Sequence, residues 1–399
     1  MTALMTRPRI PTIPILEPAQ APWIRPGAVV HDPECSVDDL LARFAGQIRE
    51  HGFQLAGYVQ QGPEELLDLA TGRTVRLDQG MIAAARSLRF AMRDDADLVV
   101  ISRFAAARKA AAEVTAAVAD GISQGMPVLT SIGGPCIGTW RDFAGPNGAM
   151  LPPDMTALWQ WWGPERLYRD LALGVADDDV RRVVCGPRWL MIEGVSGAGL
   201  AYLPVAPKEL IPKLPLLCRL SLRQLADLSR SWDPLEMAVG IAAINAHYNR
   251  FDLEAPPGNG AGHLSGGAGR VVVIGAFPGL SEVFPNAQVI EASPRPGEYP
   301  TIAMDTLLPG CGAAVVTSSA LINRTLPRIL RLAPGARVAL IGAATPLAAR
   351  LHRYGVEVLG GLIVDNPNGL ASAVHAGAPP RDFIRFGRYV HLNDERQVP

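Results

Sequence analysis

The sequence has few cysteines, little net charge and no long hydrophobic run, and each shortage excludes a class of protein. No C-x-x-C pair occurs among Cys35, Cys136, Cys185, Cys218 and Cys311, so neither a disulfide framework nor a structural zinc site is predicted. The formal net charge is -1, which gives no reason to expect nucleic acid or an anionic membrane as partner. No apolar run approaches the roughly 20 residues of a membrane helix, and a signal-peptide pattern is missing. We therefore expect a cytoplasmic protein.

Prolines recur at positions 8, 11, 14, 18, 22 and 26. This spacing excludes a helix and predicts an extended, proline-rich leader over residues 1–27. Farther on, strand-like runs at 28–30, 54–59, 96–101 and 127–132 alternate with helical patterns at 40–48 and 105–123. The alternation predicts a compact α/β domain over residues 28–147.

The first strand of this domain leads into a loop and a helix, as in P-loop nucleoside triphosphatases. The loop reads HDPECS at 31–36 and has neither the glycines nor the lysine of a phosphate cradle. Two carboxylates would face the phosphates instead. ATP hydrolysis is therefore not expected.

Three stretches of this domain resemble an uncharacterised bacterial family that is likened to nucleoside triphosphatases. They are VVHDPECSVDDLLARFAGQIREHGFQLAGYVQ, DLATGR, and DLVVISRF followed by GMPVLTSI. The family carries a Gly-Cys-Arg-Leu-Asp stretch and an Asn-Lys-Phe-Gly motif, and this chain has neither. At the second it reads Ser102-Arg103-Phe104-Ala105. The resemblance thus implies a degenerate nucleoside-triphosphatase-like domain.

Residues 155–255 show a different pattern. Short strands are predicted at 180–185, 189–193 and 200–203, separated by tight glycine-containing turns, which is typical of an antiparallel meander. Helices are predicted at 220–231 and 234–248, the second opening with a proline after Asp233. This order indicates a small α+β domain.

Residues 268–393 begin with RVVVIGAFP at 270–278, a β-branched run closed by glycine and proline. Further strands are predicted at 288–290, 313–317, 337–341 and 356–359, with helices at 321–332 and 347–354 and a terminal strand at 383–392. This pattern predicts a doubly wound parallel sheet. Ligands of such sheets bind beyond the carboxyl ends of the strands, so the loops after the first four strands are the predicted site.

The carboxyl-terminal part resembles a heavy-metal chelation family over about residues 160–390. The resemblance rests on SWDPLEMAVGIAAINAHYN, VVVIGAFPGL, VIEASPRPGEYP, LLPGCGAAVVTSSALINRTLPRIL and ALIGAATPLAARLHRYGVEVLGGLIVDNP. It implies an enolase-N-terminal-like domain followed by a Rossmann-like domain. It also implies a cleft between the two that binds a metal or a metal complex.

Position by position, the resemblance places thirteen residues in this cleft. The first two loops supply Gly275, Phe277, Pro278 and Glu291, the third supplies Thr317, Ser318, Ser319, Asn323 and Thr325, the fourth supplies Gly342, Thr345 and Pro346, and the first domain supplies Asn245. The family has Gly-Pro-Ser where this chain has Gly342-Ala343-Ala344, and Thr-Gly-Thr where it has Thr317-Ser318-Ser319. The fourth loop therefore lacks one hydroxyl of the family pattern.

These side chains offer hydroxyls, amides and one carboxylate, and no two or three convergent ligands for a bare transition metal. Oxygen-rich groups suit hard ions and oxyanions. We therefore favour a metal complex, a chelate or an oxyanion such as molybdate, held by loop N–H groups and hydroxyls.

Other interpretations stay open. Thr317, Ser318 and Ser319 fit equally well as a helix cap, and Asn323 and Asn245 fit as partners of buried backbone groups. Glu291 follows the second strand, where dinucleotide folds hold ribose, but GAFPG lacks the G-x-G-x-x-G spacing. The alternative function is an enzyme that acts on a nucleotide or a small anionic substrate in the same cleft, with Glu291 as the general acid or base. A scaffold without a small ligand and a homo-oligomer are also left open.

Overall fold

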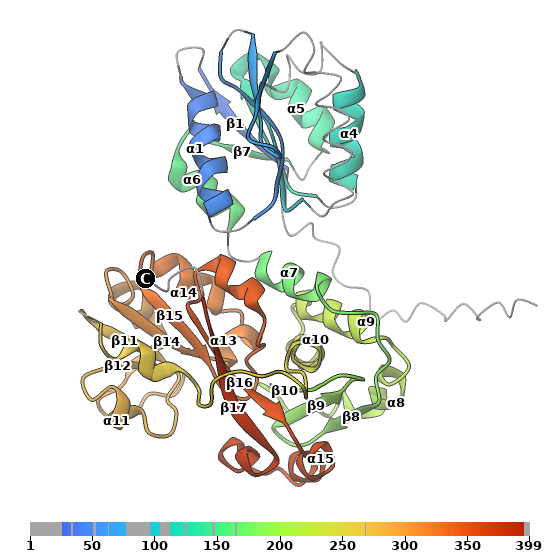
Figure 1. Ribbon diagram of the computed structural model, residues 1–399, viewed down its shortest axis with the longest axis vertical. Coiled ribbons are helices and arrows are strands. Elements are labelled where there is room, and N and C mark those ends of the chain that lie inside the picture. Colours follow the sequence, from blue (N-terminus) through green and yellow to red (C-terminus); the bar gives the residue numbers. More distant parts are fainter. Residues whose placement is uncertain are drawn as a thin grey trace, which may run out of the picture. The chain divides into compact units, whose positions relative to one another are not determined.

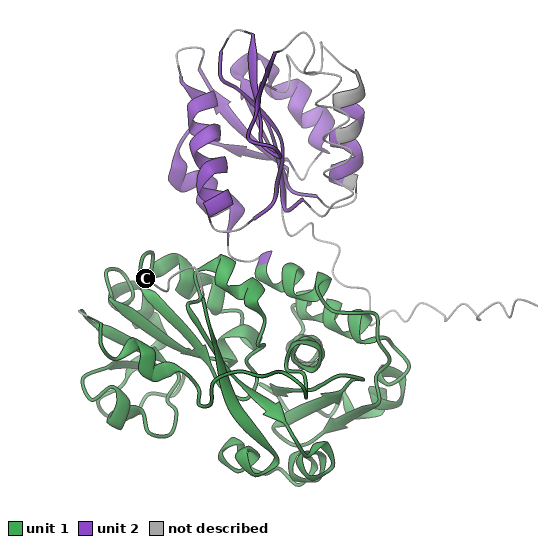
Figure 2. Cartoon of the chain, viewed as in Figure 1, with its two compact units in different colours: residues 1–21, 167–399 green, residues 22–166 purple. Residues whose placement is uncertain are grey.

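The computed structural model describes residues 26–32, 35–50, 53–62, 64–76, 96–103, 112–123, 126–145, 148–163, 166–267 and 269–394. The chain divides into an N-terminal unit, Pro22–Arg166, and a C-terminal unit that contains Leu167–Pro399 (Figure 2). Each unit is described by itself. Residues 1–25 of the predicted leader and the first part of the helix predicted at 105–123 lie outside the described residues, and Gly27, the last residue of the predicted leader, begins the first strand.

The N-terminal unit contains a seven-stranded sheet in its described part, with the order β4-β3-β2-β5-β6-β1-β7. The strands are β1 (Gly27–His31), β2 (Leu55–Gln60), β3 (Glu65–Asp68), β4 (Thr74–Arg76), β5 (Leu98–Ile101), β6 (Val128–Gly133) and β7 (Ala149–Leu151). Strands β2, β5, β6, β1 and β7 run parallel, while β3 and β4 are antiparallel.

Helices cover both faces of this sheet, α1 and α6 on one side and α4 and α5 on the other (Figure 1). They span Val37–Glu50 (α1), Ala112–Ser123 (α4), Ile137–Ala144 (α5) and Met155–Trp162 (α6). Helix α1 buries six side chains at helical spacing, Val37, Leu40, Leu41, Phe44, Ala45 and Ile48, because its apolar stripe faces the sheet. The predicted parallel α/β arrangement is confirmed here.

The C-terminal unit begins with a small α+β part. Strands β8 (Arg182–Cys185), β9 (Trp189–Glu193) and β10 (Ala198–Tyr202) form an antiparallel meander. Its helices are α7 (Leu167–Leu173), α8 (Leu214–Leu217), α9 (Leu222–Asp227) and α10 (Pro234–Tyr248), with a 3₁₀ turn, η5 (Leu228–Arg230), between the last two. Eleven of the residues of α10 are buried, because α10 packs on the meander and also on the larger sheet.

That larger sheet has seven strands among the described residues, in the order β13-β12-β11-β14-β15-β16-β17. The strands are β11 (Val271–Ile274), β12 (Gln288–Glu291), β13 (Tyr299–Pro300), β14 (Ala313–Thr317), β15 (Arg337–Ile341), β16 (Val358–Val364) and β17 (Gly387–Asn393). Only the pairing of β16 with β17 is antiparallel in this part of the chain. The predicted Rossmann-like parallel sheet is confirmed.

Alternate residues of these strands belong to two separate cores. Val272 and Val316 pack in the core that contains α10, whereas Val273 and Val315 pack on the opposite face with the 3₁₀ helix η6 (Ala261–Leu264). Both faces of the central strands are therefore buried, which explains the continuous runs of β-branched residues. The remaining helices are α11 (Leu280–Val283), α12 (Met304–Leu307), α13 (Ser319–Ile322), α14 (Leu326–Leu332) and α15 (Pro367–His375), with 3₁₀ segments η7 (Thr301–Ala303), η8 (Ala349–Tyr354) and η9 (Pro380–Phe386).

Two predicted helices differ from the structure. The helix predicted at 321–332 is divided into α13 and α14 by Arg324, which has a φ of 59°. A residue in the left-handed region ends a right-handed helix. The helix predicted at 347–354 is the 3₁₀ helix η8. The terminal strand was predicted to begin at residue 383, but it begins at Gly387, because the preceding residues form η9.

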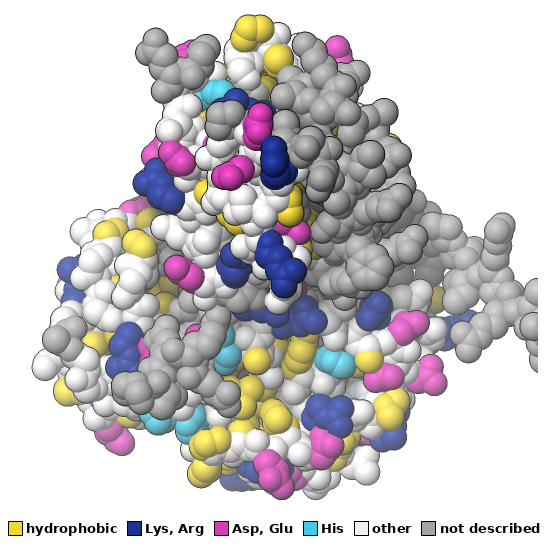
Figure 3. Space-filling view, turned by 45° about the horizontal axis from the view of Figure 1, so that its top comes forward, with side chains coloured by type: hydrophobic (Ala, Val, Ile, Leu, Met, Phe, Trp, Pro, Cys, Tyr) yellow, Lys and Arg dark blue, Asp and Glu magenta, His cyan; other side chains and the backbone are white. Residues whose placement is uncertain are grey.

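The surface carries charges of both signs. Figure 3 shows Lys and Arg side chains interspersed with Asp and Glu on the face in view, as a formal net charge of -1 would suggest. Within the described ranges, none of the helices has the length and hydrophobicity to cross a membrane.

Candidate functional site

Strands β11 and β14 are neighbours in the centre of the larger sheet. The chain continues from β11 to β12 and β13 on one side, and from β14 to β15, β16 and β17 on the other. The carboxyl ends of β11 and β14 therefore lie where the connections diverge, which is the usual binding position in open α/β sheets. Three of the four predicted loops follow β11, β12 and β14.

The first two loops are joined by Glu291. One carboxylate oxygen accepts a hydrogen bond from the Ala276 backbone N–H at 2.5 Å, and the other accepts from Ala292 N at 3.2 Å. Phe277 is half-buried and Pro278 is exposed. Glu291 thus holds the first loop in place while its side chain stays partly accessible.

The Thr317 side chain connects the first and third loops. Its hydroxyl donates to Ile274 O at 3.1 Å and lies 2.9 Å from Ser319 Oγ. Gly275 has a φ of 88°, and a Cβ at this position would lie 2.1 Å from Thr317 Oγ1. Only glycine fits there. Ser319 is exposed above this contact.

The other residues predicted in the third loop make local contacts. Asn323 Oδ1 accepts from Thr325 N at 3.1 Å and from Thr325 Oγ1 at 2.6 Å. Ser318 is buried, and a Cβ at Gly342 would lie 2.7 Å from Ser318 Oγ. The third and fourth loops are therefore packed closely together.

The fourth loop is buried against α10. Asn245 donates from Nδ2 to Leu200 O at 2.7 Å and to Ala344 O at 3.0 Å, and Thr345 and Pro346 are buried. We call this contact between α10 and the loop after β15 the seam. Two of its buried polar atoms, Asn245 Oδ1 and Thr345 Oγ1, have no hydrogen-bond partner. The structure therefore separates the predicted residues into an accessible group around Glu291 and Ser319 and a buried group in the seam.

Arg324 links the same two parts of the C-terminal unit, and no sequence pattern predicted this role. Its guanidinium lies over the rings of Tyr168, at 4.7 Å, and Trp232, at 4.6 Å. It donates to Ser229 O at 3.0 Å and Ser231 O at 2.7 Å. Burial lowers the pKa of Arg324. An arginine with a positive φ depends on tertiary contacts, which periodicity cannot show.

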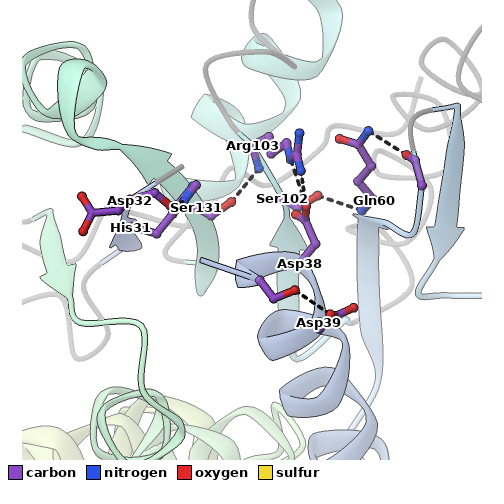
Figure 4. A network of polar contacts seen from close by, with 10 residues as sticks. His31, Asp32, Asp38, Asp39, Gln60, Ser102, Arg103 and Ser131 are labelled. Carbon is purple, nitrogen blue, oxygen red and sulfur yellow. Dashed lines mark hydrogen bonds and ion pairs between the residues drawn. The ribbon is translucent and has the colours of Figure 1, made fainter. Parts of the chain in front are cut away.

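The corresponding edge of the N-terminal unit has its own polar network (Figure 4). Arg103, with a φ of 53°, donates from Nε to Asp38 Oδ2 at 2.9 Å, and its backbone N–H donates to Ser131 Oγ at 2.8 Å. Asp39 accepts from Ser36 Oγ at 2.7 Å. The first turn of α1, where P-loop proteins hold phosphate, here carries the chain's own carboxylates.

Metal-binding side chains do not converge in the described residues. There, no group of three or more His, Cys, Asp or Glu side chains is placed to hold a metal ion. Cys311 is buried before β14, and burial raises the pKa of its thiol, which disfavours the thiolate that binds metals.

Comparison with known proteins agrees with this fold. Two family models described as "Putative heavy-metal chelation" match residues 264–393 (DUF364) and 168–248 (DUF4213). A solved DUF364 protein of unknown function from Desulfitobacterium hafniense is 31% identical, with a TM-score of 0.51, and the match covers 57% of this chain and 97% of that chain. The chain belongs to the DUF364 family. A second DUF364 structure, from Pyrococcus horikoshii, is 21% identical over 57% of this chain and 98% of its own, with a TM-score of 0.48.

The N-terminal unit of this DUF364 protein matches a different family model, DUF2478, a "Protein of unknown function", over residues 27–161. A curated relative, "Molybdenum import ATP-binding protein ModC 2" from Bradyrhizobium diazoefficiens, is 27% identical over 161 residues. That match covers 35% of this chain, and the chain spans only 18% of the relative's length. Both expected resemblances are confirmed.

Proposed function

We propose that this DUF364 protein binds a small metal complex at the carboxyl edge of its larger sheet, between the loops after β11, β12 and β14. The proposal rests on two oxygen-bearing side chains with accessible surface, Glu291 and Ser319. They follow β12 and β14, the two strands that flank β11, beside the close contact between Gly275 and Thr317. A complex brings its own ligands, so it needs no cluster of three protein side chains.

The charge of Glu291 determines whether an anionic or a cationic ligand is favoured at this site. Two unit charges 4 Å apart interact by about 4 kcal/mol at an effective dielectric constant of 20. A free dianion such as molybdate would meet roughly twice that repulsion from an ionised Glu291. A complex that presents positive charge or hydrogen-bond donors is favoured instead. Molybdate is still worth testing, because the curated relative is named for molybdenum import.

The seam supports a polar guest as well. Leaving a buried polar atom without a partner costs about 1–3 kcal/mol, and Asn245 Oδ1 and Thr345 Oγ1 are two such atoms. A water or a ligand group that reached either atom would supply the missing hydrogen bond. This is how the buried group of predicted residues would take part in binding.

A thermal-shift panel tests the proposal. The full chain is heated with imidazole or histidine complexes of Ni²⁺, Co²⁺, Cu²⁺ and Zn²⁺, and with molybdate, tungstate, sulfate and ATP. A ligand at 100 times its Kd stabilises the folded state by about 2.7 kcal/mol, which should raise the Tm by several degrees. At least one metal complex is expected to do so.

Glu291→Gln is the decisive variant, with Glu282→Gln as its control. Glutamine keeps an oxygen for Ala276 N but removes the charge, so the Tm without ligand should be nearly unchanged and the ligand-induced rise should be lost. Glu282 is exposed in α11, and its variant should behave as wild type. Binding that survives in Glu291→Gln while turnover of a nucleotide or small anion stops would favour the enzyme alternative. No rise with any metal complex would overturn the proposal.

A further inference from the structure

Two histidines meet on the opposite face of the larger sheet from α10. His263 lies in η6 and His391 in β17, and their Nε2 atoms are 3.0 Å apart. Val390 packs in the core that contains α10, so the next residue of the strand, His391, points to the other face. Ala261 and Leu264 anchor η6 in the core of that face, which leaves His263 exposed beside His391.

His391 is held rigidly. Its backbone N–H donates to Pro256 O at 3.0 Å, and its Nδ1 lies 3.3 Å from Gly258 O. Gly260 passes so close that a Cβ there would lie 2.8 Å from the Cβ of His391. Because the carbonyl of Gly258 can only accept a hydrogen bond, Nδ1 carries the proton and the free lone pair of His391 is on Nε2. A histidine that binds a metal usually donates its other N–H to a carbonyl in this way.

The separation of the two nitrogens suits one metal ion. With metal–nitrogen bonds of about 2.05 Å, nitrogens 3.0 Å apart subtend an angle of about 94° at the ion. If both imidazole rings point at that ion, their centroids are about 4.7 Å apart. If the two Nε2 atoms instead face each other in a straight line, the centroids are about 5.3 Å apart. The observed distance between the centroids is 4.9 Å.

An angle near 90° matches neighbouring positions of a square-planar or octahedral ion, whereas a tetrahedral ion would need nitrogens about 3.3 Å apart. Imidazole nitrogens in tetragonal geometry are typical of Cu²⁺ and Ni²⁺. We propose that His263 and His391 form a two-histidine site for Cu²⁺ or Ni²⁺, with the remaining positions filled by water or a small chelator.

Binding requires only a small rearrangement. In the unbound pair His263 Nε2–H donates to His391 Nε2, and this proton must leave Nε2 for the ion to enter. Since His263 is exposed, its proton can move to Nδ1 through water, and both Nε2 lone pairs then face the ion. The site is separate from the proposed metal-complex site, because β17 lies five strands away from β12 in the sheet, which is about 24 Å at ~4.8 Å per strand.

Equilibrium dialysis of the full chain, without a histidine tag, against Ni²⁺ tests the site. Wild type is expected to bind one Ni²⁺ per chain at this site. Replacing the exposed ligand, His263→Ala, should raise the Kd at least tenfold without unfolding the protein. His375→Ala, which removes another exposed histidine, should bind as wild type, and so should Glu282→Gln, which removes an exposed carboxylate.

A spectroscopic measurement keeps the test independent of affinity. The electron paramagnetic resonance spectrum of bound Cu²⁺ should show two equivalent imidazole nitrogens in wild type and one in His263→Ala. Equal Ni²⁺ affinity in wild type and His263→Ala would overturn the proposal, as would the absence of bound Ni²⁺ from both. Equal losses in His263→Ala and His375→Ala would overturn it too, since the ion would then not be held by this pair.

Discussion

Replacing Asn249 with alanine is expected to loosen the seam between α10 and the loop after β15. Asn249 is 1% exposed and follows the last turn of α10. Its Nδ2 donates to Thr345 O at 3.0 Å and Leu362 O at 3.2 Å, and its Oδ1 accepts from Leu347 N at 2.9 Å. One side chain thus satisfies three backbone groups of the Rossmann-like part.

The expected loss follows from those three bonds. Each contributes about 1 kcal/mol net, and each buried group left without a partner costs about 1–3 kcal/mol. Since water can enter part of the space, we expect a loss of about 3 kcal/mol in the free energy of unfolding of the C-terminal unit. This corresponds to a more than hundredfold rise in the unfolding equilibrium constant, at about 1.4 kcal/mol for each factor of ten.

Hydrogen exchange followed by mass spectrometry measures this loss, because the slowest amides exchange through global opening. Peptides from α10 and β16 should exchange more than a hundredfold faster in Asn249→Ala, while peptides from β1 and β2 in the N-terminal unit serve as an internal reference. Asn323→Ala is the matched control, since Asn323 is exposed and, within the described part of the chain, its side chain accepts hydrogen bonds only from Thr325. A change below about 1 kcal/mol in Asn249→Ala would refute the reasoning.

Three further predictions concern Gly275, His247 and Arg324. Gly275→Ala should destabilise the C-terminal unit by more than about 2 kcal/mol, because it adds a collision with Thr317 to the strain of a positive φ. Gly297→Ala, at a φ of 92° with open space, should cost only about 1 kcal/mol in urea unfolding. Burial lowers the pKa of His247, so its contribution to stability is present above the unfolded pKa of 6.5 and is lost as the pH falls below that value. In His247→Gln, the free energy of unfolding should therefore fall less between pH 7.5 and pH 5.5 than in wild type. Arg324→Ala should cost about 2–3 kcal/mol, measured by urea unfolding, and an unchanged midpoint would contradict the role of its two charged hydrogen bonds.

Strands were the most predictable part of the fold. The runs at 313–317 and 337–341 coincide with β14 and β15, and the helix at 234–248 coincides with α10. These segments have strong local signals, namely β-branched residues buried on both faces and a proline after a capping aspartate. Short strands at or next to the sheet edges, β3, β4, β7 and β13, were missed, because short, partly exposed strands have no clear pattern.

The candidate site was less predictable than the fold. The sequence placed Glu291, Thr317 and Ser319 after neighbouring strands, and the structure brings these loops together. The sequence also predicted Thr345 and Asn245 as site residues, although both are buried. Whether a side chain at a strand end faces solvent or an adjoining helix depends on how the meander part packs on the sheet.

The sequence by itself determined the α/β class, the order of most strands and helices, and the family, because these depend on local patterns and short motifs. Only the tertiary structure decided which loops stay accessible, that Arg324 interrupts a helix, and that His263 and His391 meet although they are 128 positions apart in the chain. Such contacts are set by the packing of distant segments, and periodicity along the chain carries no information about them.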